Sequence, residues 1–212
     1  MAGLFIPGWG AHAGLYRAAL PRGWQALEPP TFRTTRGSFA AYRVWLADML
    51  AEHPGAIDLG GHSFGAALAV LAAHDSPASV RRLVLVEPAG LPLDKPMPRS
   101  MLDFALQAFG GAYPSREAAR ATMSVLAAPR AALRLARTVR MLNLRDEFEQ
   151  LRARELPCTV VGARSDTLTP TGHCRSIAEL LGADYRELTV DGGHMWFLGA
   201  AALHRRQFAP SS

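Results

Sequence analysis

The chain has 212 residues, of which 49% are hydrophobic and 19% are charged. This length suits one domain, with or without an insertion, and the hydrophobic fraction excludes a largely disordered chain. The net charge is +5, but no basic patch with a recognisable reading element accompanies it, which argues against a nucleic-acid-binding protein.

Six short apolar segments bounded by glycine or proline are predicted strands. They are mostly hydrophobic throughout, which is typical of parallel strands buried on both faces. Helical stretches separate them, and this alternation predicts an α/β fold with a parallel sheet flanked by helices. The predicted strands are, in chain order, Gly3–Pro7, Trp24–Glu28, Ile57–Gly60, Arg82–Glu87, Cys158–Gly162 and Tyr185–Val190.

Helix starts are marked by capping residues. Ser38 is the predicted cap of a helix that runs to about residue 52. Asp146 followed by Glu149 resembles a capping box and predicts a helix start there. A helix over Thr171–Leu181 follows a proline and ends before a glycine, as helices commonly do.

The alternation of strand and helix breaks between residues 91 and 155, where only helices are predicted. An apolar repeat from Met101 at helical spacing predicts the first of them, and Pro129 suits the first turn of another. We interpret residues 91–155 as a helical cap inserted after the fourth strand. Residues 1–90 and 156–212 then form the core.

Gly61-His62-Ser63-Phe64-Gly65 follows the third predicted strand and opens a helix of small residues. In this strand–turn–helix setting, Gly-x-Ser-x-Gly is the pattern of a nucleophile elbow. The glycines allow a tight turn, whose strain lifts the serine hydroxyl clear of the sheet. The alternative interpretation of Ser63 is a structural turn residue, and His62 is interpreted as a packed neighbour of the elbow.

A serine is a weak nucleophile unless a base removes its proton and a third group orients that base. Asp166 lies in the loop after the fifth predicted strand, and His194 lies in the loop after the last. With Ser63, both follow the carboxyl ends of strands, where open parallel sheets place their sites. Alternatively, Asp166 caps the following helix and His194 is an ordinary loop residue. Glu87, at the end of the fourth strand, is the rival for the acid role.

Pro7-Gly8-Trp9-Gly10 is a glycine-rich turn directly after the first strand. The backbone N–H groups of Trp9 and Phe64 would bind the oxyanion of a tetrahedral intermediate. His12, near this turn, is a candidate substrate contact or an exposed loop residue. Apolar side chains that either border the substrate or belong to the core are Phe104, Met123 and Trp196.

At these positions the chain resembles the α/β-hydrolase superfamily along nearly its whole length. It is most similar to small serine hydrolases with a helical cap, which include carboxylesterases, thioesterases and acyl-carrier-protein methyl ester hydrolases. The resemblance implies Ser63 as nucleophile, His194 as general base and Asp166 as its orienting acid. It also implies Trp9 and Phe64 as oxyanion donors, with neither metal nor cofactor. Serine at the elbow argues against the haloalkane dehalogenase and epoxide hydrolase branches, which place aspartate there.

The chain also departs from the family. The leading antiparallel strands are absent, because the first predicted strand begins almost at Met1. The segment Glu28-Pro29-Pro30-Thr31-Phe32 replaces the usual loop after the second strand and alters one wall of the pocket. We therefore expect a minimal α/β-hydrolase fold, a six-stranded parallel sheet in the order 2-1-3-4-5-6 with a helical cap.

The sequence predicts a cytoplasmic serine hydrolase that cleaves carboxylic esters of small to medium acyl groups through an acyl-Ser63 intermediate. No secretory leader is visible, and Cys158 and Cys174 are too few for a disulfide scaffold or a metal knuckle. Thioesters are the second substrate class. The alternatives are a ligand-binding protein that retains this fold, and a cofactor-free C–C bond hydrolase or perhydrolase.

The arginines of the predicted cap suggest a partner. Residues 116–145 hold seven arginines against one acid, Glu117. At helical spacing, Arg130, Arg134 and Arg137 share one sector of a helix. This surface is either a solvated helix face or a docking site for an anionic carrier, such as acyl carrier protein or a coenzyme A thioester.

Overall fold

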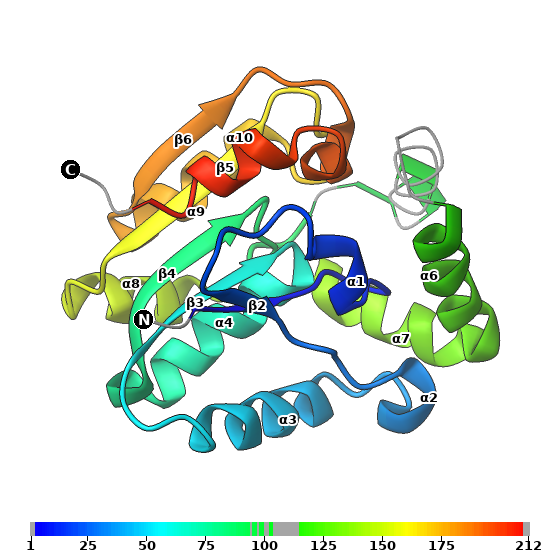
Figure 1. The fold of residues 1–212 in the computed structure, drawn as a ribbon, viewed down its shortest axis with the longest axis horizontal. Coiled ribbons are helices and arrows are strands. Elements are labelled where there is room, and N and C mark those ends of the chain that lie inside the picture. Colours follow the sequence, from blue (N-terminus) through cyan, green and yellow to red (C-terminus); the bar gives the residue numbers. More distant parts are fainter. Residues whose placement is uncertain (1–2, 94, 97, 100–101, 104–114, 210–212) are drawn as a thin grey trace.

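A six-stranded parallel sheet forms the centre of the molecule (Figure 1). The computed structural model describes residues 3–93, 95–96, 98–99, 102–103 and 115–209. The strand order is β2-β1-β3-β4-β5-β6, so the predicted fold class and strand order are confirmed. The strands are β1 (Gly3–Ile6), β2 (Trp24–Ala26), β3 (Ile57–His62), β4 (Val80–Val86), β5 (Cys158–Ala163) and β6 (Asp184–Leu188).

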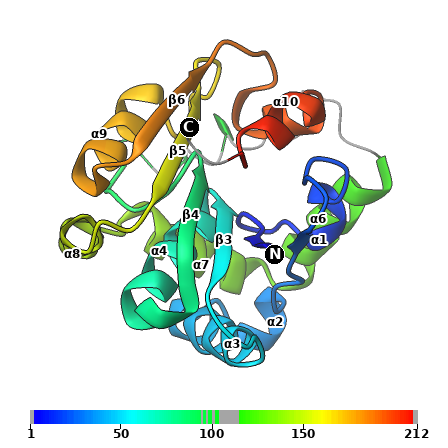
Figure 2. The same ribbon diagram turned by 60° about the vertical axis from the view of Figure 1, so that its left-hand side comes forward.

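Helices cover both faces of this sheet (Figures 1 and 2). The α-helices are α1 (Ala13–Tyr16), α2 (Phe32–Thr35), α3 (Phe39–Ala51), α4 (Phe64–Asp75), α6 (Ser115–Ala127), α7 (Pro129–Arg140), α8 (Arg145–Ala153), α9 (Thr171–Leu181) and α10 (Ala201–Arg206). Two 3₁₀ turns accompany them, η1 (Pro77–Ser79) and η2 (Gly193–Leu198).

The two faces of the sheet belong to two hydrophobic cores. The larger core joins the sheet to α3, α4, α8 and α9, and the smaller core joins it to α1, η2 and α10. Successive residues of β4 alternate between them, because side chains of a strand point to opposite faces. Leu83 and Leu85 lie in the larger core, whereas Val84 and Val86 lie in the smaller one.

Local sequence explains several helix ends. The Ser38 hydroxyl accepts a hydrogen bond from the Ala41 N–H at 3.4 Å and caps α3. Pro129 occupies the first turn of α7. Gly182 ends α9 in the left-handed conformation, with φ of 63°. These three helix ends are as the sequence predicts.

The capping box predicted at Asp146 and Glu149 is wrong. Helix α8 already begins at Arg145, and Leu144 before it makes no side-chain cap hydrogen bond. Burial fixes this helix instead: Phe148 is 0% exposed and packs in the larger core, where α8 contacts α4 and α9. The acidic side chain at position 146 therefore lies within the first turn, not before it.

The predicted cap contributes α6, α7 and α8 to the described structure. Helices α6 and α7 contact each other and α2, while α8 lies against α4 and α9. The apolar repeat that begins at Met101, including Phe104, lies outside the described residues. The division of the chain into core and cap stays a prediction.

None of the described helices combines the length and hydrophobicity that crossing a membrane requires. Both cysteines carry free thiols, Cys158 half-buried and Cys174 buried. Burial raises the pKa of each thiol above its usual range. Both thiols are therefore protonated at neutral pH.

Candidate active site

Ser63 stands at a strained turn between β3 and α4. Its φ of 54° and ψ of −117° lie in a region that residues other than glycine rarely adopt. The turn is held by its backbone, since the Ser63 N–H donates to the Val86 carbonyl at 2.9 Å and its carbonyl accepts from the Ala66 N–H at 3.0 Å. This is the backbone geometry expected of a nucleophile elbow.

The glycines of the motif are sterically required. A Cβ atom at Gly61 would lie 2.4 Å from the backbone carbon of Gly65. A Cβ atom at Gly65 would lie 2.1 Å from the carbonyl oxygen of Ile6 in β1. Both distances are far shorter than a van der Waals contact, so only glycine lets α4 leave the sheet this closely.

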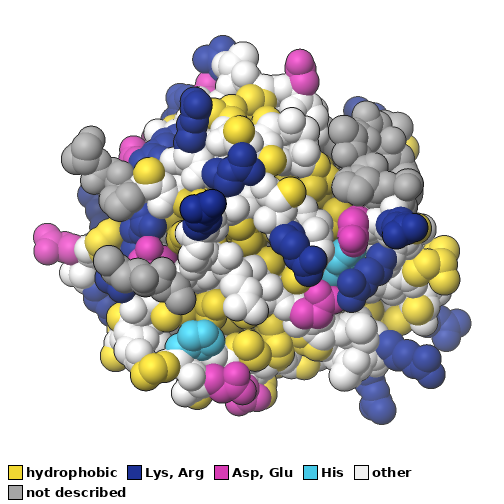
Figure 3. Space-filling view, viewed as in Figure 1, with side chains coloured by type: hydrophobic (Ala, Val, Ile, Leu, Met, Phe, Trp, Pro, Cys, Tyr) yellow, Lys and Arg dark blue, Asp and Glu magenta, His cyan; other side chains and the backbone are white. Residues whose placement is uncertain are grey.

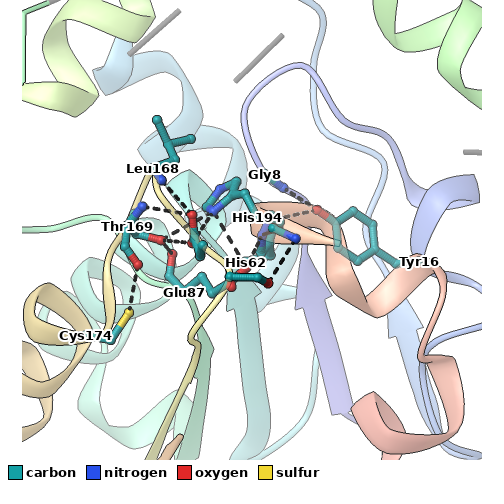
Figure 4. A network of polar contacts seen from close by, with 11 residues as sticks. Gly8, Tyr16, His62, Glu87, Leu168, Thr169, Cys174 and His194 are labelled. Carbon is teal, nitrogen blue, oxygen red and sulfur yellow. Dashed lines mark hydrogen bonds and ion pairs between the residues drawn. The ribbon is translucent and has the colours of Figure 1, made fainter. Parts of the chain in front are cut away.

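Asp166, after β5, and His194, after β6, form a buried pair. The His194 Nδ1 atom lies 2.7 Å from Asp166 Oδ2, and the two residues are 1% and 3% exposed. The same carboxylate accepts hydrogen bonds from the Leu168 N–H at 2.7 Å and the Thr169 N–H at 3.1 Å. The Thr169 hydroxyl adds a third at 2.5 Å, and Figure 4 shows Thr169 and His194 converging on this group.

These contacts determine the charge of Asp166. Burial raises its pKa, but the charge of His194 and the hydrogen bonds from His194 and Thr169 outweigh burial and hold the pKa below its usual range. The ionised carboxylate then accepts the Nδ1–H of His194 and leaves Nε2 as the basic atom. The alternative cap role of Asp166 is wrong, because Pro170 stands at the cap position of α9 without a side-chain cap bond.

A buried chain of hydrogen bonds joins the turn after β1 to the His194 loop (Figure 4). The Gly8 N–H donates to the Tyr16 hydroxyl oxygen at 3.1 Å, and that oxygen lies 2.8 Å from His62 Nδ1. His62 Nε2 lies 3.0 Å from the His194 carbonyl oxygen. His62 and Tyr16 therefore lie between the two loops that flank the elbow.

The direction of this chain follows from its chemistry. Because a carbonyl oxygen only accepts, His62 Nε2 carries the hydrogen that is donated to His194. Burial lowers the pKa of His62 well below its usual range, so the ring is neutral. Its Nδ1 atom consequently accepts from the Tyr16 hydroxyl. The Gly8 N–H is therefore engaged in this chain of hydrogen bonds.

Sequence reasoning missed Tyr16 and Thr169. Asp166 followed three residues later by threonine is a signal for a local side-chain turn, and it could have pointed to Thr169. No local pattern marks Tyr16, because its partner His62 lies 46 residues further along the chain.

Glu87 lies at the end of β4 against the same network (Figure 4). It is 0% exposed, and its Oε2 atom is 3.4 Å from His62 Nε2 and 3.6 Å from His194 Nδ1. Burial, followed by the negative charge of Asp166, raises the pKa of Glu87 well above its usual range. The raised pKa favours the neutral form of Glu87, and the shorter distance favours Asp166 as the partner of His194.

The donor atoms of His62, Glu87 and His194 lie within 4.8 Å of one another, close enough to be considered as metal ligands. Their hydrogen bonds favour another use. His62 Nε2 donates to a carbonyl oxygen and His194 Nδ1 faces Asp166, so a metal ion would have to displace both bonds. We assign these atoms to the hydrogen-bond network.

A pocket of about 300 Å³ lies beside the turn after β1. Gly8, Gly10 and Phe64 line it on one side. The unusual segment Glu28–Phe32 forms another wall, as the sequence predicts, and α6 contributes Arg120. The Arg120 guanidinium lies 2.7 Å from Glu28 Oε1 and links the two walls.

His12 also lines this pocket, although it is only 5% exposed. Its Nε2 atom lies 3.0 Å from Glu117 Oε2 of α6. Its buried Nδ1 atom makes no hydrogen bond to any residue that the structure describes. His12, a predicted substrate contact, thus lines the pocket, and its Nδ1 atom lacks a hydrogen-bond partner among the described residues.

Two of the other predicted pocket residues lie elsewhere. Met123 is 61% exposed and does not line the pocket, to which α6 instead presents Ser124. Trp196 is 1% exposed in the smaller core, where its ring centroid lies 5.4 Å from that of His204. Met123 is exposed because α6 presents another side of its surface to the pocket. Trp196 is buried because its large apolar ring packs in the smaller core. Phe104 lies outside the described residues.

The two predicted oxyanion donors belong to well-packed residues. The Trp9 indole N–H donates to the Ala132 carbonyl of α7 at 3.1 Å, and its ring lies 5.2 Å from the Phe32 ring. Phe64 is 2% exposed and packs edge-on against Tyr42 at 5.1 Å. Side-chain packing thus fixes the backbone at both positions.

Comparisons with known proteins agree with this fold. The model of the alpha/beta hydrolase family matches residues 4–206. A putative lipase from Acinetobacter baumannii is 18% identical, with a TM-score of 0.72 over 98% of this chain and 81% of its own. A lipase-esterase related protein from Clostridium acetobutylicum is 16% identical, with a TM-score of 0.75 over 97% and 92%. The thioesterase domain from the curacin biosynthetic pathway is 19% identical, with a TM-score of 0.64 over 98% and 90%.

The search of curated proteins found no match. At the identities above, the solved structures show a shared fold and no more. Substrate and mechanism must therefore be argued from this chain's own residues.

Proposed function

The chain belongs to the alpha/beta hydrolase family, and we propose that it is a serine hydrolase that cleaves carboxylic esters of small to medium acyl groups. The observation that carries this proposal is the buried Asp166–His194 pair, 2.7 Å apart, next to a strained serine turn. The ring of His62, the residue before Ser63, lies 4.5 Å from the His194 ring. The proposed nucleophile, acid and base thus follow strands β3, β5 and β6 of the sheet.

In the proposed acylation step, Ser63 Oγ attacks the ester carbonyl carbon while His194 Nε2 takes the serine proton. Asp166 accepts the Nδ1–H and stabilises the charged ring. The backbone N–H groups of Trp9 and Phe64 stabilise the oxyanion. The carbon–oxygen bond to the alcohol then breaks, and His194 returns the proton to the leaving oxygen.

In the proposed deacylation step, water attacks the acyl-Ser63 carbonyl and His194 takes the proton of that water. The serine oxygen leaves, receives the proton and is restored, and the carboxylic acid is released. The ester, one water molecule and the side chains named above account for every atom and proton in the two steps, so the reaction requires no cofactor. The pocket of about 300 Å³ beside Phe64 has the size of small-ligand sites and supports a small to medium acyl group.

Turnover of p-nitrophenyl esters of increasing chain length, with labelling by a fluorophosphonate, tests the proposal. We expect turnover of the butyrate ester and one covalent label per chain at Ser63. Saturable ester binding without turnover or label would instead indicate a ligand-binding protein of this fold.

Thioesters are the second candidate substrates, because the surface of α7 is rich in arginine. Arg130, Arg134 and Arg137 are exposed, and none of them pairs with an acid among the described residues. Of these three, Arg130 and Arg134 line a groove beside α7 and Arg137 does not, so an anionic carrier, either acyl carrier protein or coenzyme A, would dock against Arg130 and Arg134. A thioester would follow the same two steps, with a thiol as leaving group.

We expect Tyr16→Phe to lower kcat about tenfold or more with little change in KM, because it removes a positioning contact rather than a substrate contact. Loss of the hydroxyl leaves the Gly8 N–H and His62 Nδ1 unpaired in the core, at about 1–3 kcal/mol each. Both loops beside the elbow then lose a constraint. Steady-state kinetics with p-nitrophenyl butyrate and urea unfolding measure the two effects.

Tyr185→Phe is the matched control for this prediction. It removes a hydroxyl that donates to the Thr171 carbonyl of α9 at 3.3 Å, outside the chain of bonds between the two loops. We expect this variant to keep its kcat. Equal kcat losses in both variants would show that Tyr16 acts on stability alone.

We expect Glu87→Gln to keep kcat/KM within about threefold, because the native side chain is already neutral. Its raised pKa means that the folded state holds a proton that the unfolded state releases. Stability is therefore full below the unfolded pKa and falls as the pH rises toward the folded pKa, by up to about 1.4 kcal/mol per pH unit. Urea unfolding between about pH 5 and pH 8 should show a flatter profile for the variant.

Parallel pH profiles for Glu87→Gln and the wild-type protein would contradict this assignment. A loss of activity as large as that of an Asp166 variant would move the orienting acid to the end of β4.

A further inference from the structure

A groove of about 720 Å³ lies between α2 and α7. It adjoins the pocket described above, because Phe32 and Arg33 line both. Among the described residues that line the groove none is acidic, and four are arginines: Arg33, Arg36, Arg130 and Arg134.

These four arginines have no counter-charge in the described part of the chain. None of them makes an ion pair or a side-chain hydrogen bond with a described residue. Other arginines do, such as Arg120 with Glu28 at 2.7 Å, and Arg164 with Glu187 at 2.6 Å. Like charges gathered without a partner destabilise one another, so the groove favours an anion.

The amino-terminal end of α7 opens into the same groove. Ala128 and Pro129 line it, and Ala128 stands at the cap position without a side-chain cap bond. The first N–H groups of a helix have no partner within that helix and carry the positive end of its dipole. Helix and arginines thus favour the same kind of ligand.

We propose that this groove binds the phosphate or diphosphate carried by the leaving group of a substrate whose acyl group occupies the adjoining pocket. Guanidinium groups form paired hydrogen bonds with phosphate oxygens, and helix amino-termini bind phosphate as well. A coenzyme A thioester has this chemistry, with an uncharged acyl-thiol arm and phosphates at its far end. Dark blue side chains gather at the lower right of Figure 3, where Figure 1 places α2 and α7.

The shape of the site favours a small polyanion over a protein surface. The arginines come from two helices and converge on one concavity, whereas Arg137, exposed on the same α7, does not line it. The inference rests on the proposed function only in placing the acyl group in the adjoining pocket beside Phe64. Phosphate binding itself can be measured without turnover.

The first test is calorimetric titration of inorganic pyrophosphate and of adenosine 3′,5′-bisphosphate into the full-length protein. We expect saturable binding that weakens with salt, because exposed charges are screened. Arg134→Gln should raise Kd about fivefold or more, and Arg130→Gln with Arg134→Gln should raise it further. Arg137→Gln is the matched control: it removes the same charge from the same helix and should leave Kd unchanged.

The second test compares two thioesters of the same acyl group, butyryl coenzyme A and S-butyryl-N-acetylcysteamine, of which only the first carries phosphates. Arg130→Gln with Arg134→Gln should lower kcat/KM for the coenzyme A substrate about tenfold. The same variant should keep its activity on the neutral thioester. Pyrophosphate should compete with the first substrate only.

Absence of saturable pyrophosphate binding would overturn the inference, as would equal effects of Arg134→Gln and Arg137→Gln. Equal losses for the two thioesters would also overturn it. A loss seen only with a butyrylated acyl carrier protein would assign the arginines to protein docking instead. The proposed function fails separately, if pyrophosphate binds but neither p-nitrophenyl butyrate nor the thioesters are hydrolysed.

Discussion

Ser63→Ala should lower kcat for p-nitrophenyl butyrate by about 10³-fold or more. In the proposed mechanism, Ser63 Oγ forms the acyl-enzyme, and alanine removes this atom without adding bulk. The backbone bonds that hold the elbow, to Val86 and Ala66, do not involve the side chain. The variant should therefore keep its thermal unfolding transition and circular dichroism spectrum while it loses both turnover and the fluorophosphonate label.

Ser176→Ala is the control for this experiment, since Ser176 is exposed on α9 away from the elbow. It should keep both turnover and label. If Ser63→Ala still hydrolysed the ester within a few-fold of the wild-type rate, Ser63 would not be the nucleophile.

Asp166→Asn should also lower kcat strongly, by about 10³-fold or more, with little change in KM. A carboxylate only accepts, so it holds the hydrogen on His194 Nδ1, and Nε2 is the nitrogen that takes a proton in the proposed mechanism. An amide can turn its own N–H toward Nδ1, and the ring then carries its hydrogen on the wrong nitrogen. Stopped-assay kinetics at several pH values measure this loss directly.

The size of this effect separates the two buried acids. Asp166→Asn should be far more damaging than Glu87→Gln, because only Asp166 is both ionised and within 2.7 Å of His194 Nδ1. The opposite order of the two variants would contradict the assignment of the acid.

Most of the core could be predicted from the sequence because its signals are local. Strands buried on both faces appear as short hydrophobic runs, and all six are present in the sheet. Ser38 and Gly182 cap the ends of α3 and α9 through local backbone interactions, so these helix ends can be predicted from the sequence as well. The elbow was readable because its glycines prevent clashes that arise within a few residues of the serine, such as that of Gly61 with Gly65.

The remaining features depend on tertiary contacts. The Tyr16 hydroxyl forms hydrogen bonds with Gly8 and His62, and no spacing in the sequence predicts these contacts. As apolar residues, Met123 and Trp196 are predicted from the sequence either to border the substrate or to belong to the core. Only the packing of α6 and the smaller core shows that one faces solvent and the other is buried.

The failed capping box has the same cause. Asp146 and Glu149 have the right spacing, but with Phe148 buried α8 begins at Arg145, and Leu144 takes the cap position in place of Asp146. A gain of about 1 kcal/mol from a cap is smaller than the gain from burying a phenyl ring in the core.

The hydrogen bond from the Trp9 indole N–H to the Ala132 carbonyl connects the turn after β1 to helix α7. One end of this bond lies in the glycine-rich turn that carries the proposed oxyanion donor, and the other end lies in the first turn of α7. Helix α7 cannot swing away from the sheet without breaking this bond or pulling the turn with it. In the proposed mechanism, a displacement of α7 would therefore also displace the Trp9 backbone N–H that binds the oxyanion.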